Sequence, residues 1–258
     1  LQKERPASTI NIAVIEKYPE FFTGIPYGGR SGYTSLLITS LEDFLPEPEL
    51  SEYIKWLNGR KTELLKLFMD EGGTLCKKWL EEHKDEIARN EWKKIFLPRR
   101  FFGIYLREKL QSLIDEVEKK GYARIHLIID KIEDVDHKND VYHLHGSKQT
   151  ISAHRVVLGI GSPPTRSIWS PLDFKKNANT LLIPELYQPG IKDRIEEIKQ
   201  FVLQSGRSDL RILIIGANAS ALEILYKLNY LEEITSRVSK FYLLSSLGLI
   251  PDSKIDLE

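Results

Sequence analysis

A glycine turn in the C-terminal part of the sequence offers the clearest chemistry of this chain. Four apolar residues, Ile212 to Ile215, run directly into Gly216, and a helix-forming series begins at Ala219. A strand that turns tightly into a helix directs backbone N–H groups and the positive end of the helix dipole at one point. Such a point can hold the pyrophosphate of a dinucleotide.

The turn matches the dinucleotide fingerprint G-x-G-x-x-G in part. Gly216 holds the first position, Asn218 the second and Ala221 the third, with Ala219 and Ser220 between the last two. Asn tolerates a positive φ better than most residues, and Ala still lets a helix pack closely on its strand. We predict that these five residues bind a nicotinamide dinucleotide. An ordinary strand-to-helix turn of an α/β protein is the alternative interpretation.

Other chemistries lack a complete set of residues. Cys76 is the only cysteine, so the sequence has neither a disulfide framework nor a cysteine-based metal site. His143 and His145 alternate along one expected strand, but no third metal ligand is evident beside them. No G-x-S-x-G motif marks a hydrolase nucleophile. We therefore assign no catalytic residue and expect no metal.

The composition is that of an ordinary globular protein and argues against several kinds of partner. The 258 residues suffice for one large or two small domains. Lys and Arg number 37, as do Asp and Glu, so no net charge attracts nucleic acid or an anionic membrane. No apolar run approaches the roughly 18 residues that span a bilayer. We expect a cytoplasmic protein with a small-molecule substrate, and the oligomeric state stays open.

The elements that must position the turn follow one another in a definite order. A buried strand at Ile10–Ile15 ends in Glu16, and a loop from Thr23 to Ser35 carries four glycines. The remaining expected elements are helices at 50–59, 61–94, 96–121 and 192–203, and strands at 123–129, 141–144, 154–158 and 241–244. Asn139 and Asp140 predict a hairpin turn within a β-meander.

Four segments taken in this order resemble one family, the FAD/NAD(P)-binding flavoproteins of the YdhS-like type. They are GIPYGGRSGYTSLL, LPRRFFGIYLREKL, HRVVLGIGSPP and GANASALE, starting at Gly24, Leu97, His154 and Gly216. The third is similar to the second flavin motif of such proteins. The fourth is similar to the inserted nicotinamide-dinucleotide fold of flavin monooxygenases and their relatives.

The resemblance implies an α/β fold with two Rossmann-like domains. It places an FAD-binding domain at 1–165, with a helical insertion at about 50–95. A connecting segment at 166–208 then leads to the start of an inserted NAD(P)-binding domain at 209–258. In such proteins a strand and a glycine turn precede the acid that Glu16 represents, and further sequence completes the second domain. On this comparison we expect both domains to be incomplete in the chain.

The resemblance also assigns residues to the flavin side. Glu16 would accept hydrogen bonds from the adenosine ribose, and Arg100 would contact a phosphate or carboxylate. The backbone at Tyr27, Gly28 and Gly29 would approach the flavin ring or its phosphates, and the backbone at Ile132 would contact adenine. Gly159 and Gly161 would close the strand of the second flavin motif. The alternatives are an exposed acid for Glu16, a helix-start arginine for Arg100 and simple core packing for Ile132.

The function implied is a flavin-dependent NAD(P)H oxidoreductase, monooxygenase-like, that uses FAD and passes hydride to it from NAD(P)H. Ser245 and Ser246 follow the last strand, at the position where an acidic residue would favour NAD. Because no acid stands there, we slightly favour NADP over NAD as the cofactor. One alternative is a non-enzymatic nucleotide-binding fragment that cannot hold FAD alone. A weaker alternative is a simple NAD(P)-dependent dehydrogenase that uses only the Gly216 turn.

Overall fold

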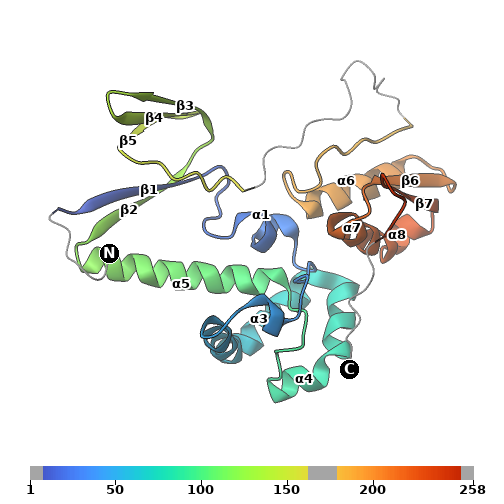
Figure 1. Cartoon of the computed structure of the whole chain (residues 1–258). Helices are drawn as coiled ribbons and strands as arrows, with labels where there is room; N and C mark the ends of the chain where they lie inside the picture. Colours follow the sequence, from blue (N-terminus) through green and yellow to red (C-terminus); the bar gives the residue numbers. More distant parts are fainter. Residues whose placement is uncertain (1–7, 162–178, 251–258) are drawn as a thin grey trace. The chain divides into compact units, whose positions relative to one another are not determined.

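The computed structural model describes residues 8–161 and 179–250 (Figure 1). The chain divides into two compact units. Unit 1 comprises Leu1–Gly29 and Arg100–Arg166, and unit 2 comprises Arg30–Arg99 and Ser167–Glu258. This division groups the helical segment after Arg30 with the C-terminal part. The predicted domain boundaries at 165 and 208 stay predictions.

Unit 1 contains a parallel pair of strands and a long helix. Strand β1 (Ile10–Glu16) pairs with β2 (Ala123–Ile129) in continuous register, as their runs of β-branched residues predict. Helix α5 (Arg99–Lys119) precedes β2 and buries its apolar residues mainly in its first two turns. Both predicted strands and the predicted helix are confirmed, although the helix begins three residues later than its motif.

A three-stranded antiparallel meander follows in unit 1. It consists of β3 (Ile132–Lys138), β4 (Val141–Gly146) and β5 (Thr150–Ala153), in that spatial order. Asn139 and Asp140 connect the first two strands with φ values of 51° and 60°. Two consecutive positive φ angles are typical of the type I′ turn, so the predicted hairpin is confirmed.

The predicted strand at 154–158 is wrong. Strand β5 ends at Ala153, and residues 155–161 have no regular secondary structure. Val157 is 94% exposed and Leu158 is 71% exposed. A strand needs a neighbour for its backbone hydrogen bonds, and the described part of unit 1 gives this apolar segment none. Gly159 and Gly161 therefore lie in an irregular segment rather than at the exit of a strand.

Short helical turns occupy the glycine-rich loop. Helix α1 (Gly24–Tyr27) belongs to unit 1, and the 3₁₀ turn η1 (Gly29–Ser31) follows it.

Unit 2 continues with α2 (Leu41–Phe44), α3 (Glu49–Glu82) and α4 (Lys84–Arg89). The backbone of α3 departs from helical geometry at Gly73, where φ is 56°, because glycine adopts this conformation without a Cβ penalty.

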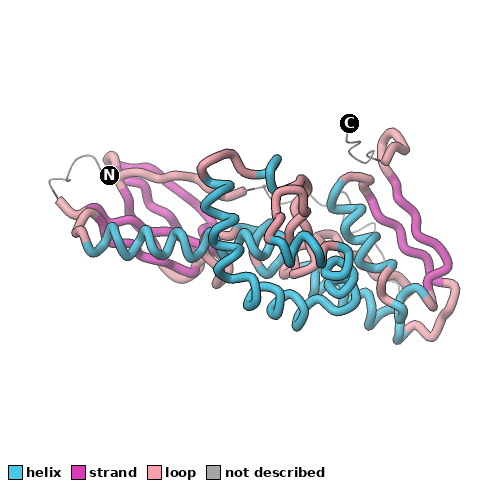
Figure 2. Tube along the Cα trace, turned by 90° about the horizontal axis from the view of Figure 1, so that it is seen from below, coloured by secondary structure: helices cyan, strands magenta, loops and turns pink. Residues whose placement is uncertain are grey.

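The C-terminal part of unit 2 is a small α/β layer. It contains α6 (Ile191–Gln204), β6 (Leu210–Ile215), α7 (Ala219–Asn229), α8 (Glu232–Thr235) and β7 (Val238–Leu244). The two strands are parallel and pair from Leu210 to Ile215 (Figure 2). Their inward residues pack with the helices around a core of Ile191, Ile224, Leu228 and Ile234. The fold class is thus α/β with parallel strands, as predicted.

Within residues 8–161 and 179–250, none of the helices combines the length and the apolar character needed to cross a membrane.

Candidate functional site

The turn after β6 has the conformation that the sequence predicts. Gly216 adopts a φ of +116°, which residues with a Cβ rarely adopt. Its N–H donates to the carbonyl of Leu244 on β7 at 2.7 Å, so the turn stays tied to the sheet. A Cβ added at Gly216 would contact Ala221 at 3.9 Å, which shows how closely the helix start packs on the turn.

Asn218 begins helix α7 as its N-cap. Its side-chain oxygen accepts from the N–H of Ala219 at 2.8 Å, and its carbonyl accepts from the N–H groups of Ala221 and Leu222. The first N–H groups of a helix have no partner inside the helix. Asn218, Ala219 and Ser220 are exposed, so this helix end is open to an anion. The residues present fit the pyrophosphate of a dinucleotide.

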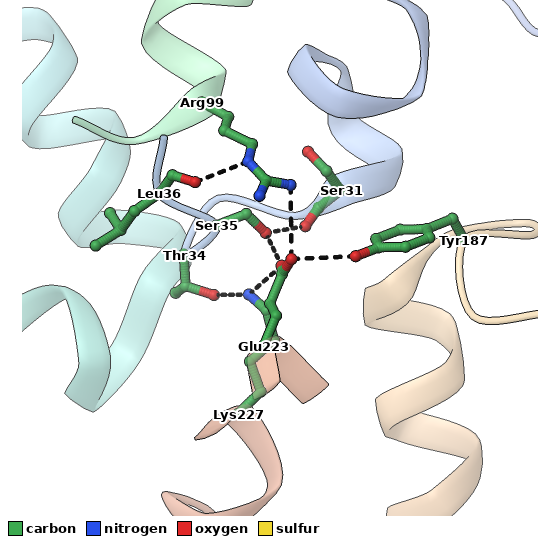
Figure 3. A network of polar contacts seen from close by, with 8 residues as sticks. All are labelled: Ser31, Thr34, Ser35, Leu36, Arg99, Tyr187, Glu223 and Lys227. Atoms are coloured by element: carbon green, nitrogen blue, oxygen red, sulfur yellow. Dashed lines mark hydrogen bonds and ion pairs between the residues drawn. The ribbon is translucent and has the colours of Figure 1, made fainter. Parts of the chain in front are cut away.

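A buried polar network lies three residues beyond Ser220 on α7, with the carboxylate of Glu223 at its centre (Figure 3). The Tyr187 hydroxyl donates to Glu223 at 3.1 Å, and the Arg99 guanidinium lies 3.5 Å from the same oxygen. The Ser35 hydroxyl is within hydrogen-bond reach of Glu223 and of the Ser31 carbonyl. The network therefore connects α7 with the loop at 31–36 and with the segment before α6.

Lys227 adds a second cation on the next turn of α7. Its Nζ lies 3.6 Å from Glu223 and donates to the Thr34 hydroxyl. The side chains of Lys227, Glu223 and Arg99 are only 5%, 13% and 17% exposed. Burial lowers the pKa of the Lys227 ammonium more than the neighbouring Glu223 raises it, and Arg99 lowers it further. One carboxylate thus stands between two largely buried cations.

Sequence reasoning missed this network. Glu223 and Lys227 interrupt a helix face whose other members are Ile224 and Leu228, and polar residues in such a place indicate a buried polar contact. That signal was available. Nothing in the sequence pointed to Tyr187 or Ser35 as partners, because both contact Glu223 from distant segments.

A second carboxylate-centred cluster lies in unit 1. Glu20 pairs with Arg100, lies 2.8 Å from Arg107, and accepts from the N–H of Gly29 at 2.7 Å. Burial raises the pKa of Glu20, but these hydrogen bonds and positive charges outweigh it and lower the pKa overall. Arg100, predicted to contact a phosphate or carboxylate of a cofactor, thus contacts a carboxylate of its own chain.

The loop beside this cluster is held by close packing. The Tyr27 ring meets Phe102 edge-on, with ring centroids 5.1 Å apart. A Cβ on Gly103 would overlap the carbonyl of Tyr27, and a Cβ on Gly28 would lie within 2.8 Å of Thr23. The structure therefore brings together four of the predicted flavin-side residues, namely Tyr27, Gly28, Gly29 and Arg100.

The other predicted flavin-side residues lie elsewhere in the described part of unit 1. Glu16 ends β1, and its carbonyl accepts from the N–H of Asp130 at 3.0 Å. Ile132 begins β3 opposite Gly146. Gly159 and Gly161 belong to the irregular segment after β5. No contact described for unit 1 joins these residues to the Glu20 cluster.

The two histidines of β4 have polar partners in the meander. His143 lies 3.0 Å from the hydroxyl of Ser152, and His145 lies 2.9 Å from the carboxylate of Asp136. Among residues 8–161 and 179–250, no group of three His, Cys, Asp or Glu side chains could hold a metal ion.

Comparisons with known proteins place the chain in an FAD/NAD(P)-binding family. A family model described as FAD-NAD(P)-binding matches residues 1–163. Uncharacterized proteins of Mycobacterium bovis and Mycobacterium tuberculosis are 32% identical over 249 residues, which is 94% of this chain and 46% of each relative. The chain thus spans about half the length of the curated relatives it matches.

Proposed function

The chain belongs to the FAD-NAD(P)-binding family, and from this premise we propose that it binds a nicotinamide dinucleotide at the turn from Gly216 to Ala221. We further propose that it serves a flavin-dependent NAD(P)H oxidoreductase of the monooxygenase-like kind. A bound nicotinamide and a bound flavin supply the hydride chemistry themselves. The protein's part is to bind the dinucleotide, orient it and exclude water.

One observation carries the proposal. A parallel strand, a glycine with φ of +116°, an Asn-capped helix and an exposed helix start occur together at 210–222. The alternative, an ordinary strand-to-helix turn, does not need the helix start to be left open to solvent. Asn218 takes up the N–H groups of Ala219, Ala221 and Leu222, so the positive end of the helix dipole is what favours an anionic ligand here.

The residues of this chain support FAD binding less directly than they support binding of the nicotinamide dinucleotide. In the part of unit 1 that the structure describes, no strand runs through a glycine turn straight into a helix. The described part of unit 1 therefore offers the FAD pyrophosphate no turn like the one at Gly216. This observation favours a second candidate function, a nucleotide-binding polypeptide that cannot hold FAD alone. A simple NAD(P)-dependent dehydrogenase would not need the flavin-like segments of unit 1.

The nicotinamide cofactor is proposed to be NADP with a small margin over NAD. Ser245 follows β7, and its carbonyl accepts from the N–H of Gly248 at 3.3 Å in a tight turn. Neither Ser245 nor Ser246 carries the charge that repels a 2′-phosphate. Uncharged serines also give a 2′-phosphate no positive charge to pair with, so we expect affinities for NADPH and NADH within about tenfold of each other.

The most specific test replaces the side-chain amide of Asn218, at the helix start, with a carboxylate. Asn218→Asp keeps the N-cap, because Asp caps helices as well as Asn does, but it places a negative charge beside the pyrophosphate. We expect NADPH affinity to fall about tenfold or more, with the melting temperature unchanged or slightly raised. Quenching of nicotinamide fluorescence measures the affinity.

Asn229→Asp at the other end of α7 is the matched control, since it changes the net charge equally but lies away from the turn. Gly216→Val should abolish binding outright because of its backbone strain, whereas Gly59→Val, at a helical site with open space around it, should not. Equal affinities of Asn218→Asp and the unaltered chain would remove the proposed site.

Retention of added FAD after desalting decides between the first and second candidate functions. The full-length Mycobacterium tuberculosis relative is the comparison, since this chain spans 46% of it. If the relative retains FAD and this chain does not, the second function holds for the chain. If neither protein retains FAD, the flavin proposal is wrong.

A further inference from the structure

We infer that Glu223 and Tyr187 are positioning residues for the dinucleotide turn, a role that rests on the proposed function. The geometry points to this because Glu223 lies on the same turn of α7 as Ser220, three residues after it. Whatever fixes the Glu223 side chain therefore also fixes the rotation of the exposed helix start.

Four side chains hold this carboxylate, three of them from other segments of the chain. Ser35 approaches from the loop at 31–36, Arg99 from the first position of α5, Tyr187 from the segment before α6, and Lys227 from the next turn of α7. All belong to unit 2. Side chains that converge on one group lose rotamer freedom when the chain folds. The conformational entropy needed to order the helix start is therefore lost on folding and not on ligand binding.

The hydroxyl of Ser220 lies next to that of Tyr187. It acts as a hydrogen-bonding neighbour that opposes the rise in the Tyr187 pKa caused by burial. The exposed first turn and the buried network are thus joined through a side chain as well as through the helix backbone. The two cations around a single carboxylate also leave a net positive charge close to the turn, which favours an anion there.

Tyr187→Phe tests the inference with little disturbance, because it removes one oxygen and leaves Glu223 with its three other partners. We expect the affinity for NADPH and for ADP to fall by about three- to tenfold. Adenosine, which has the same base and ribose without a pyrophosphate, should bind with unchanged affinity. A merely structural role of Tyr187 would not separate these two ligands.

Tyr226→Phe is the matched control. It is the same substitution in unit 2, on α7 itself, at a residue whose ring packs against Tyr230, 4.7 Å between ring centroids. We expect it to leave the affinities for ADP and adenosine unchanged. Ser35→Ala, which removes a different partner of Glu223, should reproduce the effect of Tyr187→Phe.

The outcomes separate this inference from the proposed function. If Asn218→Asp weakens ADP binding but Tyr187→Phe and Ser35→Ala do not, the positioning role is wrong and the proposed site stands. If the unaltered chain binds no dinucleotide, the proposed function is wrong. In that case hydrogen exchange still tests the positioning itself, since Tyr187→Phe should speed exchange in the first turn of α7 about threefold or more relative to Tyr226→Phe. Equal exchange in the two variants would overturn it.

Discussion

Two parallel strand pairs in this protein end in different ways. In unit 2, β6 passes through Gly216 into α7, and the helix start is exposed. In unit 1, β1 ends at Glu16 and is followed by a loop that reaches α1 only at Gly24. A parallel strand pair is therefore not in itself a nucleotide site. In the proposed site, the turn and the open helix end would supply the anion-binding groups.

Each unit also has a carboxylate surrounded by cations, and the difference between the two clusters is instructive. The adjacent residues Arg99 and Arg100 serve one cluster each, with Glu223 in unit 2 and Glu20 in unit 1. Glu223 stands on a helix directly behind the open turn, whereas Glu20 holds a loop through the N–H of Gly29. The same chemistry supports an open strand-to-helix turn in one unit and a closed loop in the other.

The largest effect is expected where the unit 1 loop is held most tightly. Gly103→Ala adds a Cβ that overlaps the Tyr27 carbonyl, so α1 or α5 must shift. We expect the free energy of unfolding of unit 1 to fall by about 1–3 kcal/mol, measured as faster hydrogen exchange in α5. If the loop were held by the Glu20 cluster alone, exchange would not change.

Gly59→Ala is the control for this substitution. Gly59 lies inside α3 with nothing within 4 Å of an added Cβ, so the better helix former should stabilise unit 2 by about 0.5–1 kcal/mol. Trp56, Trp79 and Trp92 lie in the described part of unit 2, so urea unfolding followed by tryptophan fluorescence reports on that unit.

An intermediate effect is expected from Glu20→Gln. The folded-state pKa of Glu20 is lowered, so its contribution to stability is present above the ordinary pKa and is lost as the pH falls through the folded value. We expect the variant to be less stable than the unaltered chain at pH 7 and the difference to disappear in acid. Hydrogen exchange in α5 at neutral and acidic pH measures this.

Glu116→Gln is the matched control for Glu20→Gln, because Glu116 pairs with Lys120 on an exposed part of α5 and both side chains are 45% exposed. Surface pairs contribute little, so this variant should exchange at nearly the same rate as the unaltered chain at both pH values. A difference in the α5 exchange rate between Glu20→Gln and the unaltered chain that persists in acid would mean that packing, rather than charge, holds the loop.

Local patterns predicted much of the fold. The runs at Ile10–Ile15 and Ala123–Ile129, the Asn139–Asp140 turn and the helix at 192–203 depend on residues close together in sequence, and all are present. The apolar segment at 154–158 carries the same local signal, yet it forms no strand. Whether this segment forms a strand depends on whether another strand lies beside it, and a local sequence pattern does not predict that.

The clusters around Glu20 and Glu223 could not be predicted for a related reason. Glu20 and Arg100 are 80 residues apart, and Ser35 and Glu223 are 188 residues apart. Spacing along one helix predicts only partners on that helix, such as Glu223 with Lys227. The glycine turn was predictable because strand, turn and helix start all lie within one short segment.

The smallest effect, and the finest test of the difference between the clusters, is expected from Lys227→Met. Because burial lowers the pKa of Lys227 in the folded chain, the charged form is disfavoured there, and the cost of burying it is relieved as the pH rises from the folded pKa toward the ordinary value. We expect the unfolding free energy at pH 7 to change by less than about 1 kcal/mol, since methionine keeps the packing and removes this cost. The unaltered chain should then gain stability relative to the variant at alkaline pH.

Urea unfolding followed by tryptophan fluorescence between neutral and alkaline pH checks this, with Lys77→Met on the exposed side of α3 as the control. The control should show no pH-dependent difference of the same kind, because an exposed ammonium has no burial cost to relieve. A loss of several kcal/mol at pH 7 on replacing Lys227 would mean that Glu223 depends on the ammonium. Arg99, Tyr187 and Ser35 would then be insufficient to hold the carboxylate behind the open turn, and the two clusters would be alike in needing both of their cations.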